Sequence, residues 1–376
     1  MERRILFIKF GKFSHINRSV LEILKKEYSD YEIDIVDAWQ VLKNKISIFH
    51  YMINIFFFIA EYGKEIVLGQ KKWKQSPTWF FATSYLSIRV SKFLKKIGHE
   101  KKYVFTFQTQ SIFNGKLTGI PHFIYTDHTT KTNLLYPDIN PKQYIRSKRF
   151  IKRSELKIYQ DATMIFTLGS LPAFSLTNQY GIKKEKVAIA FAGSNTTAPT
   201  FNNAGKYYSK NILFVGMAWE RKGGPILLKA FSKILQKHPD ATLTIVGCNP
   251  RNIPYPNCKI IGKVSSEEVA KYYNESAIFC LPTIREPFGI VFIEAMNYRL
   301  PVIANNIGCL PDMVINDYNG YLINNNVDEY AIAICRLLEN PEKCKQMGER
   351  GHQYAQEKFT WERVGKTIKT NIDKFL

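Results

Sequence analysis

Short β-rich runs alternate with helical segments along the first half of this 376-residue chain. The runs predicted to form strands are residues 5–10, 32–36, 103–107, 122–125 and 164–167. A helix is predicted over residues 17–28, where Val20, Leu21 and Leu24 share one face. Because strands that alternate with helices build parallel sheets through right-handed crossovers, the pattern predicts an α/β fold.

The second half repeats this alternation. Residues 211–231 contain a predicted strand, a loop with Arg221, Lys222 and Gly223, and an amphipathic helix. Further β-rich runs lie at residues 241–247, 259–262 and 300–304. The polar stretch 191–205 separates the halves, and the length suits two domains. We therefore predict an N-terminal domain at 1–195 and a C-terminal domain at 205–361.

Composition favours a folded cytoplasmic protein. Hydrophobic residues make up 45% of the chain and aromatic residues 14%, which argues against a disordered protein. The six cysteines all lie in the second half without a Cys-x-x-Cys pair, so buried reduced thiols are expected and a zinc site is not. The first residues, Met-Glu-Arg-Arg-Ile-Leu-Phe-Ile, lead directly into a strand, so we expect no secretory signal.

Two carboxylates flank a Pro-Phe-Gly turn in the stretch from Arg285 to Met296. Glu286 is expected in the loop, and Glu294 about one and a half turns inside the helix that follows Gly289. The start of that helix offers unpaired N–H groups and the positive end of its dipole, which suit a phosphate. Carboxylates beside an anion cradle suit a nucleotide-sugar, while the alternative is a helix-capping glutamate and an unrelated second one.

Taken in order, the segments from Asn211 onward resemble the nucleotide-binding half of family-four retaining glycosyltransferases of the GT-B fold. The resemblance covers residue 211 to the C-terminus well and the first half more loosely. It implies two Rossmann-like doubly wound domains that face a central cleft. The segment 359–363, Phe-Thr-Trp-Glu-Arg, resembles the family's terminal signature, so a helix at about 362–376 is expected to cross back to the N-terminal domain.

The resemblance also implies roles for individual residues. Glu286 falls on the family's first motif glutamate, which binds the hydroxyls of the donor sugar, and Glu294 falls on the second, which binds the ribose. The backbone of Phe288, Gly289 and Ile290 would donate to sugar and phosphate.

A second group of implied residues surrounds Gly216, which ends the strand before the basic loop. Arg221 and Lys222 would neutralise the diphosphate and stabilise the leaving group. Many relatives have an arginine directly after this glycine, but here that place is Met217, and Arg221 is a candidate to supply the missing guanidinium. The alternative for Arg221 and Lys222 is a solvated surface pair.

In the first half, Gly11, Gln108, Asp127 and His128 fall near the carboxyl ends of predicted strands and should point toward one crevice. Relatives place a residue that faces the reacting sugar where His128 stands. Its imidazole would bind the donor's primary hydroxyl or orient the acceptor, and Asp127 would fix the ring or contact the acceptor. A hydrogen-bonded structural histidine is the alternative, and His15 is a weaker candidate.

The sequence contains no Asp-x-Asp motif, so we expect no metal and no cofactor beyond a nucleotide-sugar co-substrate, UDP- or GDP-linked. The resemblance implies transfer of a hexose-type sugar to a saccharide or lipid-linked acceptor with retention, through front-face attack. A GT-B-shaped nucleotide-sugar epimerase or a phosphorylase is the alternative enzyme. The net charge of +21 also suggests a third hypothesis, a polyanion-binding protein, although the sequence contains no nucleic-acid-binding module.

The positive charge is concentrated in residues 1–200, which hold 31 Lys and Arg against 15 Asp and Glu. Here the apolar run 46–60 lies between basic residues and a basic, aromatic-rich stretch at 64–81. Fifteen residues are too few to span a bilayer, which needs about 20. The segment either lies on an anionic membrane surface, which would make the protein peripheral on the cytoplasmic face, or forms a core helix.

Overall fold

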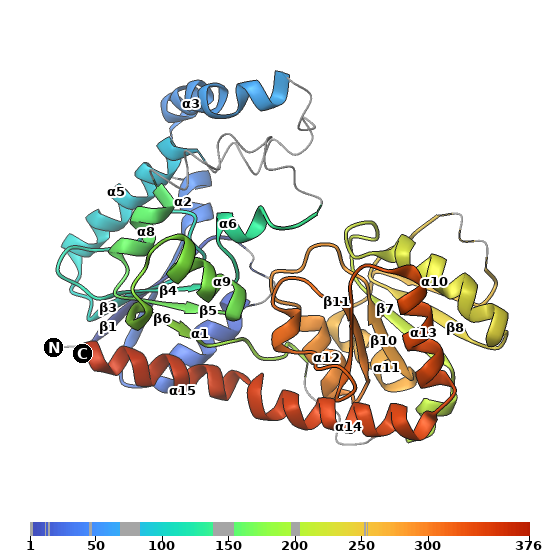
Figure 1. Ribbon diagram of the computed structural model, residues 1–376. Helices are drawn as coiled ribbons and strands as arrows, with labels where there is room; N and C mark the ends of the chain where they lie inside the picture. The colour runs from blue at the N-terminus through green and yellow to red at the C-terminus, as the bar shows by residue number, and fades with distance from the viewer. Residues whose placement is uncertain are drawn as a thin grey trace. The chain divides into compact units, whose positions relative to one another are not determined.

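The computed structural model describes residues 3–11, 13, 16–44, 47–67, 83–137, 154–196, 204–251, 253 and 255–376. The chain divides into two compact units (Figure 1). The N-terminal unit comprises Met1–Leu135, Ile139–Ala190 and Gly365–Leu376, and the C-terminal unit comprises Tyr136–Asp138 and Phe191–Val364. His15, residue 46, residues 71–81 and residues 197–203 of the predicted boundary lie outside the described residues.

One parallel sheet forms the centre of the N-terminal unit, with the strand order β2-β1-β3-β4-β5-β6. Its strands are β1 (Arg4–Lys9), β2 (Glu32–Asp37), β3 (Phe105–Thr109), β4 (His122–Thr126), β5 (Met164–Thr167) and β6 (Val187–Ile189). Every residue of β3, β4 and β5 is buried, as is typical of parallel strands with helices on both faces.

Seven helices of this unit are described besides α15, and α3 among them packs on α5 rather than on the sheet (Figure 1). They are α1 (Ile16–Glu27), α2 (Ala38–Asn44), α3 (Ile48–Val67), α5 (Ser84–Glu100), α6 (Thr130–Asn133), α8 (Leu156–Asp161) and α9 (Ser170–Phe174). Leu86, Val90 and Leu94 of α5 share a core with Leu6 and Ile8 of β1. This packing fixes α5, on which α3 rests.

The C-terminal unit has a second parallel sheet, with the order β12-β11-β10-β7-β8-β9. Its strands are β7 (Asn211–Val215), β8 (Thr242–Val246), β9 (Cys258–Gly262), β10 (Ile278–Leu281), β11 (Val302–Asn305) and β12 (Gly320–Ile323). The helices are α10 (Gly224–Lys237), α11 (Ser266–Glu275), α12 (Ile290–Asn297), α13 (Val327–Leu338) and α14 (Pro341–Lys358). The two parallel sheets confirm the predicted α/β class.

The last helix, α15 (Trp361–Ile372), begins in the C-terminal unit and belongs to the N-terminal unit from Gly365 onward. There the hydroxyl of Tyr28 donates to Asp373 Oδ1 at 3.0 Å, and Lys369 Nζ lies 4.4 Å from the centre of the Tyr28 ring. Phe375 packs against Phe123 of β4 with 6.1 Å between ring centroids. These contacts confirm that the chain end crosses back, as the resemblance implied.

Candidate active site

Two loops of the C-terminal unit meet at the carboxyl ends of neighbouring strands. One loop joins β7 to α10 and carries Arg221 and Lys222, and the other joins β10 to α12 and carries Glu286. The amide of Ile284 donates to the carbonyl of Arg221 at 3.0 Å, and Arg221 Nη1 donates to the carbonyl of Arg285 at 2.8 Å. Arg221 therefore braces the second loop, and its predicted contact with a diphosphate stays a prediction.

Gly223 permits this close approach of the loops. Its φ is +75°, and a Cβ atom at this position would lie 1.7 Å from the carbonyl oxygen of Pro282. Since neither the backbone angle nor the space allows a side chain, glycine is required here. The constraint places Lys222, the preceding residue, against the Glu286 loop.

Lys222 and Glu286 form an ion pair through Nζ and Oε2. Both side chains are largely buried, with 12% and 11% of their surface exposed. A desolvated pair of this kind is charge-assisted and holds both groups in place. The structure thus brings together Lys222, which is predicted to bind the phosphate, and Glu286, which is predicted to bind the sugar.

Tyr136 fixes the backbone on the other side of Glu286. Its hydroxyl donates to the carbonyl of Glu286 at 3.0 Å, and its side chain is only 4% exposed. Sequence reasoning missed Tyr136, because 150 residues separate it from Glu286 and no pattern around it marks the pairing.

Helix α12 starts directly after the loop, as predicted. Gly289 precedes it with a φ of +107°, and no acceptor for the amides of Gly289 and Ile290 is present among the described residues. These amides are the unpaired donors of a helix N-terminus. The ring of Phe288 is buried and packs edge-on against Phe359, with centroids 6.4 Å apart. This contact anchors Phe288 in the C-terminal unit, and the anion cradle at Gly289 and Ile290 stays a prediction.

Glu294 lies in the second turn of α12 and is 8% exposed. Tyr273 Oη donates to its Oε2 at 3.2 Å, and the backbone amide of Asn195 also donates to the carboxylate. Burial raises the pKa of Glu294 to about 7, although both hydrogen bonds oppose the shift. Glu294 therefore keeps its proton to higher pH than an exposed glutamate does.

The segment 193–195 is held in turn by the start of α15. Trp361 Nε1 donates to the carbonyl of Ser194 at 2.8 Å, and a Cβ atom at Gly193 would lie 2.6 Å from the Trp361 ring. Because Asn195 directly follows Ser194, Trp361 positions the backbone amide that donates a hydrogen bond to the carboxylate of Glu294. The sequence did not reveal this connection, because 167 positions separate Trp361 from Ser194.

In the N-terminal unit, His128 Nδ1 and Asp127 Oδ1 are 2.5 Å apart at the end of β4. Burial alone would favour the neutral ring, but the charge of Asp127, their hydrogen bond and the charge of Glu155 together raise the pKa of His128. Glu155 is buried, and its Oε1 accepts a hydrogen bond from the backbone amide of Thr130 at 2.9 Å. The predicted orientation of His128 by Asp127 is present, and Glu155 is an additional residue that sequence reasoning missed.

Two further residues predicted to point into the crevice are engaged within the protein. The amide of Gly11 donates to Asp37 Oδ1 at 3.0 Å. Gln108 is fully buried, and its Nε2 donates to the carbonyls of Gln110 and Phe113. The Nε2 group of Gln108 is used by the following loop and its Oε1 has no partner among the described residues, so its role in the crevice stays a prediction. Gly11 stays a prediction, but its N–H is already used.

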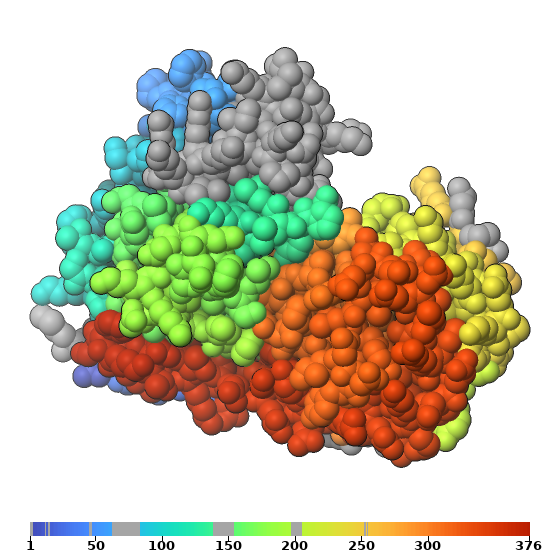
Figure 2. Space-filling view, in the orientation of Figure 1, coloured from blue at the N-terminus to red at the C-terminus, as the bar shows by residue number. Residues whose placement is uncertain are grey.

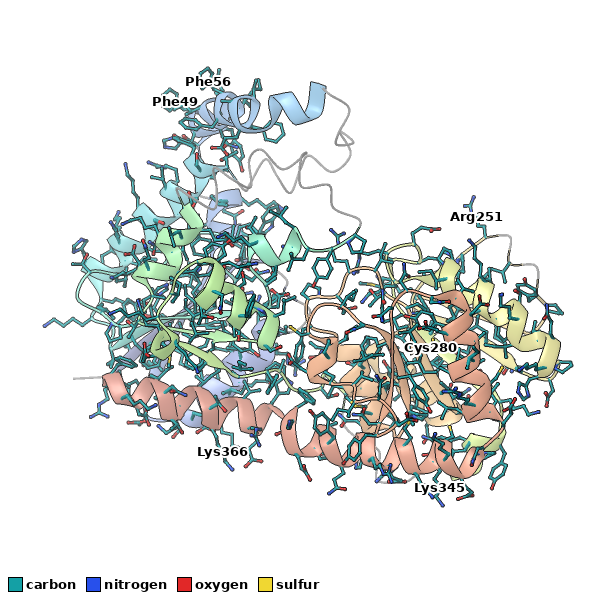
Figure 3. All side chains as sticks on the ribbon, viewed as in Figure 1. Phe49, Phe56, Arg251, Cys280, Lys345 and Lys366 are labelled. Carbon is teal, nitrogen blue, oxygen red and sulfur yellow. The ribbon has the colours of Figure 1, made fainter. Side chains whose placement is uncertain are left out.

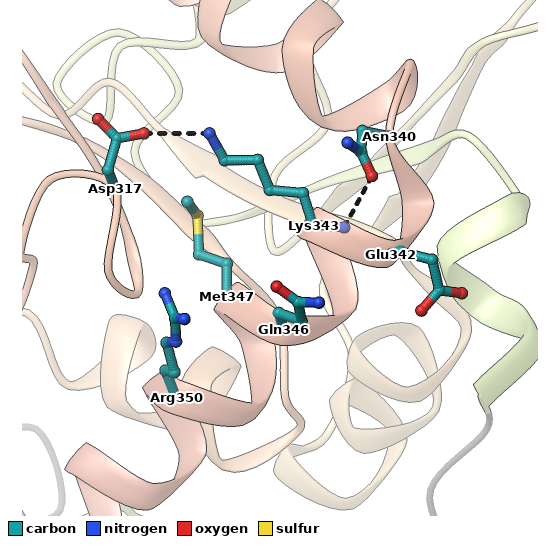
Figure 4. Close-up of a pocket in the computed structure, with 7 residues that line it drawn as sticks. All are labelled: Asp317, Asn340, Glu342, Lys343, Gln346, Met347 and Arg350. Carbon is teal, nitrogen blue, oxygen red and sulfur yellow. Dashed lines mark hydrogen bonds and ion pairs between the residues drawn. The ribbon is translucent and has the colours of Figure 1, made fainter.

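An open hollow of about 390 Å³ also lies on the C-terminal unit (Figure 4). Its lining residues are Asp317, Asn340, Glu342, Lys343, Gln346, Met347 and Arg350. Lys343 Nζ lies 3.2 Å from Asp317 Oδ1 across it. None of the predicted site residues lines this hollow, so the candidate site remains the two loops and the start of α12.

Comparison with known proteins finds a family match over the same region. Residues 201–354 match the family described as Glycosyl transferases group 1. An uncharacterized glycosyltransferase of Haemophilus influenzae is 34% identical over 177 residues, which cover 43% of this chain and 48% of that protein. Spore coat protein SA of Bacillus subtilis is 26% identical over 258 residues, which cover 60% of this chain and 68% of that protein.

The fold has counterparts among solved structures. The structure of Anabaena HepE in complex with UDP and glucose aligns with a TM-score of 0.68 at 14% identity. The alignment covers 99% of this chain and 100% of that one. At this identity the likeness establishes a shared fold only.

Proposed function

We propose, from the premise that residues 201–354 belong to the glycosyl transferases group 1 family, that this protein is a retaining hexosyltransferase. It moves a sugar from a UDP- or GDP-linked donor to a saccharide or lipid-linked acceptor. The observation that carries the proposal is the buried Lys222–Glu286 pair beside the open N-terminus of α12, with Glu294 in the next turn. Binding of UDP and glucose by a protein of the same fold supports this choice of donor class.

The donor would occupy this site by exchanging partners with the ion pair. Lys222 and the amides of Gly289 and Ile290 take the diphosphate, while Glu286 accepts hydrogen bonds from the sugar hydroxyls and Glu294 from the ribose. The charges that neutralise each other in the structure are then divided between sugar and phosphate. Glu294 has to give up its proton or its internal donors for this, which links binding to pH.

Catalysis then rests on stabilising the leaving diphosphate. The acceptor hydroxyl attacks the anomeric carbon on the face from which the diphosphate leaves, the bond from that carbon to the phosphate oxygen breaks, and the hydroxyl proton passes to the phosphate. Lys222 and the helix N-terminus stabilise the charge that develops. From the N-terminal unit, His128 held by Asp127 would orient the donor's primary hydroxyl or the acceptor.

Activity is expected to survive excess EDTA. Lys222 and the start of α12 supply the positive charge that a divalent ion supplies in metal-dependent transferases. Initial rates with and without EDTA, measured on protein first passed over a chelating resin, should agree within about a factor of two, well below the effect of losing a catalytic metal. Loss of activity in EDTA that Mn²⁺ or Mg²⁺ restores would contradict the charge argument.

Trp361→Phe is expected to weaken nucleotide binding roughly three- to tenfold, the worth of one lost hydrogen bond. The change removes the Nε1 donor to Ser194, and with it the support of the Asn195 amide on Glu294. Titration of UDP and GDP measures the effect. Tyr354→Phe is the control, because it removes two hydrogen bonds, one to the carbonyl of Asp312 and one from Lys358 Nζ, without touching segment 193–195. Equal affinities in both variants would exclude the proposed support.

The function itself is tested with a panel of radiolabelled UDP- and GDP-sugars, with and without saccharide and lipid-extract acceptors. A transferase gives a labelled acceptor product that depends on acceptor. Conversion of donor to a new nucleotide-sugar without acceptor indicates the epimerase, and dependence on inorganic phosphate for release of a sugar phosphate indicates the phosphorylase. Absence of turnover with every donor, in protein that melts cooperatively, would count against all three.

A further inference from the structure

Helix α3 of the N-terminal unit places polar side chains toward the protein. Asn54 is fully buried and accepts a hydrogen bond from Thr83, and Glu61 accepts the amide of Ser84 at 3.1 Å. His50 Nδ1 lies 2.7 Å from the hydroxyl of Tyr85. These residues recur at helical spacing and all meet the start of α5, so they define the inner face of α3.

The opposite face of α3 is apolar and exposed. Its members and their exposed fractions are Ile48 (81%), Phe49 (67%), Met52 (65%), Ile55 (48%), Phe56 (73%) and Ile59 (60%). The spacing of one, four, seven, eight and eleven residues from the first to the others puts them in one stripe. Figure 3 shows Phe49 and Phe56 on the side of α3 turned away from the sheet of this unit, and Figure 2 shows α3 at its surface.

Not every large apolar side chain of the run 46–60 lies in the outer stripe. Of the three consecutive residues Phe56, Phe57 and Phe58, Phe57 stacks on Tyr85 with centroids 5.1 Å apart and Phe58 is 7% exposed. Only Phe56 of the three belongs to the outer stripe. The helix is thus neither a core helix nor a surface helix of the usual polarity, since its outer face is more apolar than its inner one.

The segment that contains α3 and α5 is basic. Between residues 48 and 102 the sequence holds ten Lys and Arg against three Asp and Glu. Lys92, Lys95 and Lys96 of α5 are exposed, as is Ile88 one turn before them. A row of large exposed apolar side chains on a basic part of the chain fits the boundary between acyl chains and anionic headgroups. Among the described residues, no helix is long and apolar enough to cross a bilayer.

We propose that α3 docks this protein on an anionic lipid membrane. The outer stripe of α3 enters the interface parallel to the membrane, and the lysines of α5 lie near the phosphates of the headgroups. The six stripe residues supply an apolar attraction that salt does not screen, while the lysines supply one that it does. Docking does not depend on glycosyl transfer, so its failure would leave the proposed catalytic function unaffected.

Vesicle sedimentation without donor or acceptor tests the docking. The wild-type protein should sediment with phosphatidylcholine vesicles that contain phosphatidylglycerol, bind pure phosphatidylcholine vesicles much less, and retain part of its binding at high salt. Phe49→Ser/Phe56→Ser should lower the partition coefficient roughly tenfold or more with an unchanged melting temperature, since both rings are exposed. Phe174→Ser is the matched control, because Phe174 on α9 is 55% exposed but outside the stripe, and it should bind as the wild type does.

A second pair of variants separates the two attractions. Lys92→Gln/Lys95→Gln should weaken binding at low salt and leave the salt-resistant part unchanged. Should the double serine variant melt early, Met52→Gln repeats the test with a smaller change. The proposal is overturned if the wild type does not bind anionic vesicles, or if Phe49→Ser/Phe56→Ser and Met52→Gln both bind them as the wild type does. A concentration-dependent dimer that disappears in the stripe variants, with no vesicle binding, would assign the stripe to a second copy instead.

Discussion

Lys222→Ala is expected to lower kcat/KM by at least a hundredfold. The variant loses the positive charge at the site where the diphosphate leaves, and removal of one such stabilising group costs about 3 kcal/mol. It also leaves the buried carboxylate of Glu286 without its ion-pair partner. Steady-state kinetics with a donor identified from the panel measure the loss, on protein whose folding is checked by circular dichroism.

Lys229→Ala is the matched control for this prediction. Lys229 lies on the exposed face of α10, seven residues further along the same loop and helix, and makes no contact with Glu286. Its replacement should change kcat/KM by less than about twofold, as is usual for exposed charges. If Lys222→Ala stayed within a few-fold of the wild type, the leaving group would not be stabilised by this side chain.

Glu294→Gln is expected to stabilise the protein at pH 8 while it weakens nucleotide binding. Burial raises the pKa of Glu294 from 4.5 to about 7, so the folded state binds this proton more tightly than the unfolded state. The contribution of protonated Glu294 to the stability of the folded state is therefore fully present below about pH 4.5 and is lost as pH rises through 7. The loss amounts to about 3 kcal/mol above pH 7, and the amide of glutamine, which does not ionise, avoids it.

Melting curves of wild type and Glu294→Gln at pH 5, 6 and 8 check this prediction. The variant's advantage should grow from about 1 kcal/mol at pH 5 to about 3 kcal/mol at pH 8. Since about 1 kcal/mol shifts the melting temperature of a domain of this size by roughly 2–4 °C, the difference at pH 8 amounts to several degrees. A difference that does not change with pH would show that the carboxylate is ionised throughout. Nucleotide affinity should fall in the same variant, because an amide replaces the ionised acceptor for the ribose.

Local patterns sufficed to predict the fold and the Glu286 region. The spacing of apolar residues within each segment indicates whether it forms a strand or a helix. The turn before α12 depends on Pro287 and Gly289, which restrict or free their own backbone angles. Glu294 accordingly lies in the second turn of α12 as expected. Its burial beside Tyr273 could not be predicted, since that contact joins α11 to α12.

Contacts between distant residues account for what the sequence did not reveal. Tyr136 on Glu286 and Trp361 on Ser194 pair residues that are 150 and 167 positions apart. Arg221 illustrates a different limit, because the direction of a long side chain depends on which acceptors the fold brings near it. The reversed polarity of α3 had the same cause: the apolar run was visible, but the choice of inner face was made by partners on α5.

Titration calorimetry of UDP and GDP in EDTA tests the central claim most directly, with wild type, Glu286→Ala and Glu294→Ala measured side by side. The proposed site predicts that the wild type binds one of the nucleotides at one site per chain, that Glu294→Ala loses most of this affinity, and that Glu286→Ala retains it. Glu286→Ala should then lose transfer far more than nucleotide binding, because its carboxylate contacts the sugar as charge develops. Failure of the wild type to bind either nucleotide, or equal affinity in all three proteins, would contradict the assignment of the nucleotide-sugar site to Glu286 and Glu294.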